Sequence, residues 1–143
     1  MAIANAVSST NDLQPVTLTK YLVRQMMKQR RGRGVNISSI IAQTGFSGLS
    51  VYGATKVGLK GFTRSLSGEE GRAGITVNCV SPDHMLTDMT RGFETAKLES
   101  VKRRAPLGLP DRGHAAHAVL YLLEPAAERT TGSIITVDGG AAA

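Results

Sequence analysis

The sequence predicts an α/β domain with a parallel sheet that helices cover on both faces. Helix-like and strand-like segments alternate along the chain in the order helix, strand, helix, strand, helix, strand. The strand-like runs are continuous rather than alternating in hydropathy, which is typical of strands buried on both faces. A length of 143 residues suffices for one domain and is too short for two. We therefore expect a single domain over residues 1–143, with only three recognisable strands.

The first expected helix spans residues 11–30. Its apolar positions recur every fourth residue, at Leu18, Leu22 and Met26. Basic residues at its C-terminal end suit the negative end of the helix dipole, and Gly32 stops the helix. The run 34–38 that follows has a β-type composition and is the first expected strand.

A second helix is expected over 51–70, with one apolar stripe formed by Thr55, Leu59, Phe62 and Leu66. The run 75–80 is the clearest strand, and Ser81-Pro82 ends it. A polar loop and a helix-like stretch occupy 83–104.

The last long helix is expected to begin at Pro110-Asp111 and to end at Pro125. Its expected inner face consists of Ala115, Val119, Leu122 and Leu123. A third strand over 133–137 completes the pattern and stops at Gly139-Gly140.

Composition and charge narrow the possible functions. The 17 Lys and Arg residues against 11 Asp and Glu leave a net charge of +6, spread too widely to name an anionic partner. Aromatic residues make up only 4%, which argues against base-stacking platforms, so no nucleic-acid partner is expected. The single cysteine excludes an internal disulfide framework and a CxxC metal site. Without a membrane-length apolar run or a secretory signal pattern, we expect a soluble cytoplasmic protein that does not bind membranes.

Tyr52 and Lys56 stand four residues apart on the second expected helix, so their side chains share one face. A free phenol has a pKa of about 10, which is too high for easy proton exchange at neutral pH. An ammonium nearby favours the phenolate, and a tyrosine so placed becomes a serviceable acid or base. Taken alone, this spacing also arises by chance.

Further motifs surround this pair. Asn36-Ile37-Ser38-Ser39 ends the first strand, Tyr52 follows Ser39 by 13 positions, and Lys56-Val57-Gly58 continues the helix. Later motifs are Gly74-Ile75-Thr76-Val77-Asn78, Pro82, Thr87-Asp88-Met89 and Thr136-Val137-Asp138-Gly139-Gly140. From about Val7 to Gly140, the chain resembles the short-chain dehydrogenases/reductases, most closely their 3-oxoacyl-acyl-carrier-protein reductase branch. The resemblance implies a three-layer, Rossmann-like parallel sheet, here truncated to its C-terminal strands with flanking helices.

The resemblance also implies roles for individual residues. Ser39 would hydrogen-bond the substrate carbonyl, Tyr52 would donate a proton to it, and Lys56 would assist Tyr52 and hold the ribose of NAD or NADP. The loop after Pro82 would pass under the nicotinamide. Asp83 stands in this loop where the family usually has glycine, and would add bulk and negative charge there. Thr87 would reach the cofactor amide or pyrophosphate, or else is simply a loop hydroxyl.

Asn11 stands 28 residues before Ser39, where the family keeps an asparagine whose main-chain carbonyl holds a water of the proton relay. In a regular helix the amide of residue 15 would bond to this carbonyl, but Pro15 has no N–H. The carbonyl is therefore left for a water or for nothing. Asn11 as a helix cap is the alternative.

One family signature is missing from the sequence. The family begins with a Gly-x-x-x-Gly-x-Gly turn and a helix whose N-terminus receives the cofactor phosphates. No glycines here have that spacing, so we expect a partial NAD(P)-binding domain that matches the C-terminal half of the fold. On its own this polypeptide is expected to bind NAD(P)H weakly.

Other candidate residues have simpler interpretations. His114 and His117 are expected at the surface rather than on a metal, and Cys79 in the core rather than as a nucleophile. The basic cluster, defined as Lys28, Arg30, Arg31 and Arg33, is expected to be a solvated helix end. In the acyl-carrier-protein reductase interpretation, this cluster would instead dock an acidic carrier protein.

Two functions follow from the resemblance. The first is NAD(P)H-dependent reduction of a small-molecule ketone or acyl thioester. The second is a non-catalytic oligomerisation module, because in the family the helices matching 11–30 and 51–70 form a four-helix bundle between subunits. Either function is compatible with a homo-oligomer built through these two helices.

Overall fold

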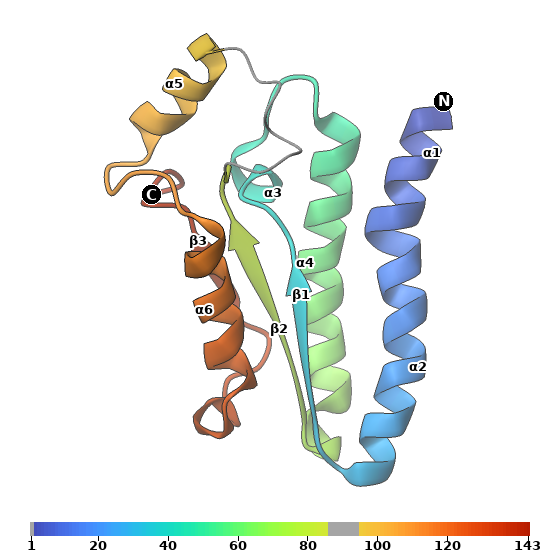
Figure 1. Ribbon diagram of the computed structural model, residues 1–143. Helices are drawn as coiled ribbons and strands as arrows, with labels where there is room; N and C mark the ends of the chain where they lie inside the picture. The colour runs from blue at the N-terminus through green and yellow to red at the C-terminus, as the bar shows by residue number, and fades with distance from the viewer. Residues whose placement is uncertain (1, 86–94) are drawn as a thin grey trace.

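A computed structural model describes residues 2–85 and 95–143. They form a three-stranded parallel sheet with helices on both faces (Figure 1). The strand order is β1 (Gly32–Ile37), β2 (Ile75–Pro82) and β3 (Ile134–Val137), so β2 is central. All of β2 is buried, whereas β1 is only partly covered. The predicted α/β fold class is confirmed.

The N-terminal helical stretch is longer than expected. It consists of α1 (Ala2–Ser8), the π-helical turn η1 (Ser9–Leu13) and α2 (Gln14–Gln29), in place of a helix beginning at residue 11. The polar run before Pro15 has the composition of a helix start. The helix nevertheless continues through it, with one wider π-helical turn. Gln14 N–H donates to the carbonyl of Ser9, five residues back, beside the proline that has no N–H.

Two helices follow β1. The short α3 (Ile41–Thr44) was not anticipated, because four residues are too few for a periodic signal. The long α4 (Ser50–Glu70) agrees with the expected helix over 51–70 and packs against β2. Its predicted stripe is confirmed, with Thr55, Leu59 and Leu66 buried and Phe62 partly buried. The short η2 (Gly71–Ala73) then leads into β2.

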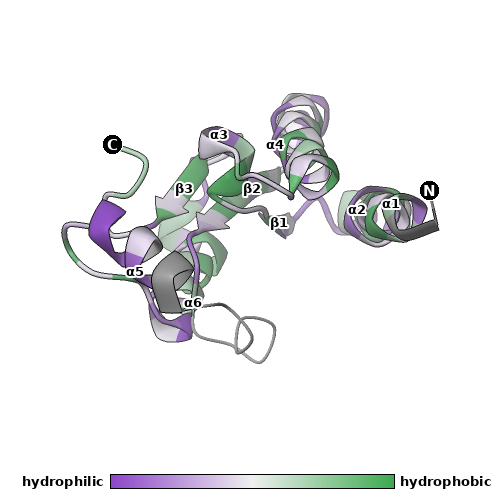
Figure 2. Cartoon of the chain, turned by 90° about the horizontal axis from the view of Figure 1, so that it is seen from above, coloured by the Kyte–Doolittle hydropathy of each residue, from purple (hydrophilic) through white to green (hydrophobic). Residues whose placement is uncertain are grey.

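The remaining helices are α5 (Thr95–Arg104), α6 (Arg112–Leu123) and η4 (Pro125–Ala127). Seen from above, α4 and α6 lie on opposite sides of the sheet (Figure 2). Leu122 of α6 is fully buried as predicted, but Leu123 is 44% exposed and the prediction for it was wrong. One residue further along a helix turns a side chain by about 100°, which here takes Leu123 off the sheet. None of the described helices is long and apolar enough to cross a membrane.

An apolar cluster lies between α2, α4 and β2. It contains the buried residues Val23, Leu66, Ile75 and Val77. Leu18 and Leu22, which belong to the apolar row that predicted the first helix, are 59% and 48% exposed. The reason is the position of α2, which stands beyond the β1 edge of the sheet rather than over its face (Figure 2). The apolar side chains of α2 therefore lie beside the β1 edge of the sheet, next to which the described residues place no further strand.

Candidate functional site

The candidate site lies at the carboxyl ends of β1 and β2, where parallel sheets present their ligand-binding residues. Ser39 comes two residues after β1 and is 9% exposed. The N–H of the next residue, Ile40, donates to the carbonyl of Pro82 at 2.9 Å. This bond places the predicted catalytic Ser39 beside the predicted cofactor-binding Pro82, which ends β2.

Tyr52 and Lys56 lie in the first half of α4, as their spacing predicts. The Lys56 ammonium is 5.6 Å from the centroid of the Tyr52 ring, within the range of a cation–π contact. Tyr52 is partly buried. Within the described part of the chain, its hydroxyl makes no hydrogen bond, so it is available to a substrate oxygen.

Lys56 is tied to the end of β1 at two points. Its ammonium donates to the carbonyl of Ile37 at 3.0 Å. Its own main-chain carbonyl accepts the hydroxyl of the buried Ser38 at 2.8 Å. The two bonds fix Lys56 against the residues immediately before Ser39. Ser38 was not among the predicted site residues, since nothing in the sequence distinguishes it from its neighbour.

Burial shifts the pKa values of three ionisable side chains near the site. Burial lowers the pKa of Lys56, while the Asp12 carboxylate acts in the opposite direction. Burial likewise lowers the pKa of Lys60, one turn further along α4. Burial raises the pKa of the Cys79 thiol, which is fully buried in β2. Cys79 is therefore a protonated core residue, as expected from the sequence.

The turn η1 places Asn11 beside α4. The neighbouring Asp12 approaches Gly58 so closely that a Cβ there would lie 3.4 Å from an Asp12 oxygen. The helix continues through Asn11, so its interpretation as a helix cap is wrong. Its carbonyl lacks the ordinary i+4 donor because that residue is Pro15.

The surroundings of Asp83 differ from those expected from the sequence. Its N–H donates to the carbonyl of Val137 at 2.9 Å, which joins the end of β2 to β3. Its side chain is only 8% exposed, and one of its carboxyl oxygens is buried without a hydrogen-bond partner among the described residues. Burial raises the pKa of this carboxyl, which favours the uncharged acid over the negative charge expected beside a cofactor. Thr87 lies outside the described residues.

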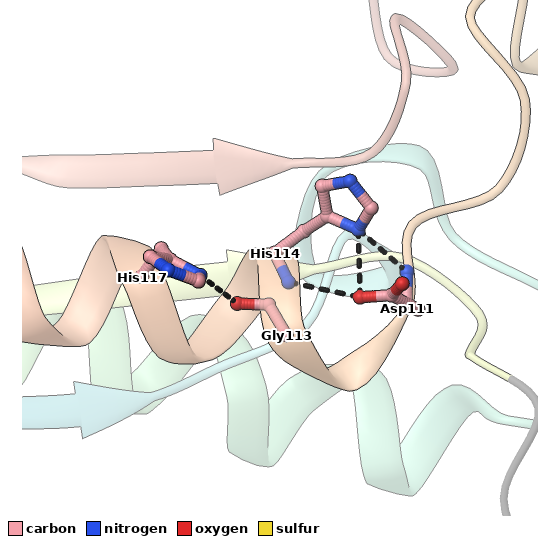
Figure 3. A network of polar contacts seen from close by, with 4 residues as sticks. All are labelled: Asp111, Gly113, His114 and His117. Atoms are coloured by element: carbon pink, nitrogen blue, oxygen red, sulfur yellow. Dashed lines mark hydrogen bonds and ion pairs between the residues drawn. The ribbon is translucent and has the colours of Figure 1, made fainter.

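The histidine pair on α6 is engaged in helix capping (Figure 3). The Asp111 carboxylate accepts the N–H of His114 at 3.0 Å, and His114 Nδ1 accepts the N–H of Asp111 at 3.1 Å. His117 Nδ1 lies 2.8 Å from the carbonyl of Gly113, to which it donates. His114 Nδ1 also lies 2.7 Å from an Asp111 carboxylate oxygen. Among the described residues, no group of three or more potential metal ligands is found around these two histidines.

The basic cluster lies at the other end of the sheet, where α2 leads into β1. Lys28, Arg30 and Arg31 are exposed, in agreement with a solvated helix end. Arg30 adopts a left-handed conformation with φ of 49° and donates to the carbonyl of Arg72 at 3.1 Å. Arg33 is the second residue of β1, so the cluster lies at the opposite end of this strand from Ser39.

Comparison with known proteins adds independent findings. The family described as enoyl-(acyl carrier protein) reductase matches residues 4–142. The chain is 36% identical over 135 residues to 3-oxoacyl-acyl-carrier-protein reductase of Vibrio cholerae, covering 94% of this chain and 55% of that protein. It is 42% identical over 132 residues to the Homo sapiens protein of the same name, covering 92% of this chain and 54% of that protein.

A solved structure shows the same arrangement. The crystal structure of 3-oxoacyl-acyl-carrier-protein reductase from Brucella melitensis superposes with a TM-score of 0.88 at 28% identity. The match covers 93% of this chain and 50% of that one. The 143 residues thus span about half the length of the relatives that they match.

Proposed function

The chain belongs to the short-chain dehydrogenase/reductase family of oxidoreductases, and we propose that its site serves the NAD(P)H-dependent reduction of a ketone, in particular a 3-oxoacyl thioester. The 143 residues would form part of a single nucleotide-binding domain. The names of the matched relatives support this substrate class. The observation that carries the proposal is the pairing of the Tyr52 ring with the Lys56 ammonium beside Ser39.

The described residues fit the reacting end of such a cofactor. The Lys56 ammonium uses one hydrogen on Ile37 and keeps two for ribose hydroxyls. Pro82 and Asp83 lie at the adjoining end of β2. The same fit does not extend to the cofactor phosphates, because the sequence contains no glycine-rich turn with the spacing that binds them. Neither NAD nor NADP is favoured by these residues.

The chemistry assigned to the chain is proton transfer. The bound nicotinamide supplies the hydride. Ser39 donates a hydrogen bond to the carbonyl oxygen and orients it, and the Tyr52 hydroxyl then gives that oxygen its proton. Lys56 stabilises the tyrosinate that remains. Asn11, one helix away, offers its carbonyl to a water that returns a proton from solvent.

A second function is favoured by a separate observation. A groove of about 320 Å³ lies between α2 and α4, lined by apolar side chains that include Val16, Met27 and Phe62. Val16 and Met27 are exposed in the isolated chain. Helix-to-helix contact here would produce the homo-oligomer expected through these helices, with or without catalysis.

The catalytic proposal is tested by joining the part of the Vibrio cholerae relative outside the match to these 143 residues and following NADPH oxidation with a 3-oxoacyl thioester. We expect Tyr52→Phe to lower the rate by about 10² or more, the usual contribution of a positioned acid. Tyr121→Phe, on the exposed face of α6, is the matched control and should leave the rate unchanged. Equal rates for the two variants would refute the role of Tyr52.

A further inference from the structure

Asp83, which follows β2, carries a buried carboxyl group. The residue is 8% exposed, and one of its carboxyl oxygens accepts the backbone N–H of His84. The other oxygen, Oδ2, is enclosed by the protein and has no hydrogen-bond partner among the described residues. A neutral acid tolerates such an enclosed oxygen more easily than a carboxylate does, because the charge needs water or a donor. The surroundings of Asp83 therefore favour its uncharged form.

A second carboxyl group lies beside it. The N–H of Asp83 donates to the carbonyl of Val137 at 2.9 Å, which places Asp83 next to the start of the turn 138–143. The two oxygens of Asp138 accept backbone N–H groups of this turn, from Gly140 at 3.0 Å and from Ala142 at 2.8 Å. The turn is thus held together by a side chain that repels a negative charge on Asp83.

The turn 138–143 packs against the segment that follows α5 (Figure 1). The N–H of Leu107 donates to the carbonyl of Gly139 at 3.0 Å. Gly139 has a φ of 63°, and the carbonyl of Gly108 occupies the place where a side chain would begin. Ala105 borders the same contact and is 5% exposed. Because the two backbones touch directly, a small displacement of the turn would break the contact.

We propose that Asp83 is a pH-sensitive latch: as a neutral acid it lets the turn 138–143 close over the end of α5, and on ionising it releases the turn. Ionisation sets a negative charge beside Asp138 and leaves Oδ2 without a donor. Movement of the turn away from α5 relieves both, because water then reaches Oδ2 and screens the two carboxylates from each other. The bond from Asp83 to Val137 joins backbone atoms and is kept, so the movement is confined to the turn and the segment after α5.

The charges around Asp83 decide the direction of the latch. Among the described residues, Asp138 opposes its ionisation, whereas Arg104 at the end of α5 and His84 favour it. Arg104 is exposed, so water and salt weaken its attraction. The segment 38–44, which Ile40 bonds to the end of β2, contains no ionisable residue.

Burial outweighs these charges, and the pKa of Asp83 lies above its ordinary value of 3.8. In the open turn, water surrounds the carboxyl group and its pKa returns toward that ordinary value. The closed turn therefore binds the proton more tightly than the open turn, and rising pH favours opening.

Residue-resolved hydrogen exchange of the 143-residue chain from pH 3 to pH 8 tests the proposal. The reporters are the amides of Leu107, Gly140 and Ala142, each corrected for its intrinsic exchange rate at every pH. Their protection should fall at least about threefold as pH rises through the pKa of Asp83, and then stay constant. Reporter protection that does not change with pH would overturn the proposal.

Low concentrations of urea separate opening of the turn from unfolding of the chain. The reference is the amide of the fully buried Cys79, which donates to the carbonyl of Ser133 at 2.9 Å in the centre of the sheet. Urea should lower the protection of Cys79 and leave that of the reporters unchanged, because a local opening exposes little surface. Reporters that share both the protection and the urea dependence of Cys79 would show that the turn opens only on global unfolding, and would refute the latch.

Three variants identify the group that titrates. Asp83→Asn should make reporter protection independent of pH, whereas Glu128→Gln, which neutralises an exposed carboxylate, is the matched control and should keep the dependence of the parent. Arg104→Met removes an attraction to the ionised form, so the fall in protection should be larger than in the parent. The latch would be refuted by a parent-like pH dependence in Asp83→Asn, or by an equal or smaller fall in Arg104→Met.

Discussion

The Lys56 ammonium donates a 3.0 Å hydrogen bond to the carbonyl of Ile37, on the outer edge of β1. This contact joins the residue assigned to support Tyr52 to the last residue of β1, two positions before Ser39. A second bond joins the same two elements, because the Ser38 hydroxyl donates to the Lys56 carbonyl at 2.8 Å. The position of Lys56 in the site thus depends on how α4 packs against β1.

Replacing Lys56 by Met keeps the apolar stem and removes the charge. Because Ile37 is exposed, water can satisfy its carbonyl, and the free energy of unfolding should change by less than about 1 kcal/mol at pH 7. Burial lowers the pKa of Lys56, so above the folded pKa and below 10.5 the unfolded chain binds more protons. The parent should therefore gain stability relative to Lys56→Met as pH rises through that window.

Urea titrations from pH 7 to pH 10.5 measure this difference, with the exposed Lys20→Met as control. A parent that loses stability relative to Lys56→Met over the same range would contradict the buried environment of the ammonium.

Replacing Ser38 by Ala removes its hydrogen bond to the Lys56 carbonyl. The hydroxyl is buried, so the loss should cost about 1 kcal/mol in chemical denaturation. Ser65→Ala, on the exposed side of α4, should cost much less and serves as the control. The tie between β1 and α4 would be unimportant to stability if both substitutions had the same effect.

Asp83→Asn should stabilise the chain at neutral pH. In the part of the chain that the structure describes, one oxygen of the buried parent carboxyl has no partner, a cost of about 1–2 kcal/mol that the neutral amide reduces. Burial raises the pKa of Asp83 above 3.8, so the folded chain holds the proton more tightly than the unfolded chain. The penalty is absent below pH 3.8, grows as pH rises through the folded pKa and stays constant above it.

Thermal unfolding of both proteins from pH 3 to pH 8 should show the two curves separating as pH rises. Parallel curves would mean that Asp83 is charged and satisfied in the folded chain.

Asn78→Ala should be strongly destabilising. The fully buried amide donates to the carbonyl of Thr130 at 2.8 Å and accepts the N–H of Ser133 at 3.1 Å. Both bonds hold the segment leading into β3, and their loss leaves two backbone groups without partners. We expect a loss of about 2 kcal/mol or more, measured by urea unfolding. Unchanged stability would show that the segment does not need this clamp.

Parts of the site could be predicted because they depend on local geometry. Tyr52 and Lys56 share a face of α4 because residues four apart do so in any α-helix. The stripe ending at Leu66 is buried because its period matches the helix. Pro15 leaves the Asn11 carbonyl without its ordinary donor because a proline has no N–H. The missing phosphate turn is also visible in the sequence.

Other features could not be read from the sequence, since they depend on which elements meet. Leu18 and Leu22 have the period of a buried stripe, yet they are exposed because α2 stands beyond the edge of the sheet. Ser38 and Ser39 are identical residues, and only the approach of α4 gives Ser38 the Lys56 carbonyl as its acceptor.

The sequence by itself determined the order of helices and strands, the shared face of Tyr52 and Lys56, and the family. Tertiary structure alone decided that Asp83 is buried, that the Lys56 ammonium donates to the Ile37 carbonyl and that the Ser38 hydroxyl donates to the Lys56 carbonyl. Local periodicity specifies which side a residue faces on its own element. Burial and hydrogen bonding depend on the neighbour opposite, which lies tens of residues away along the chain.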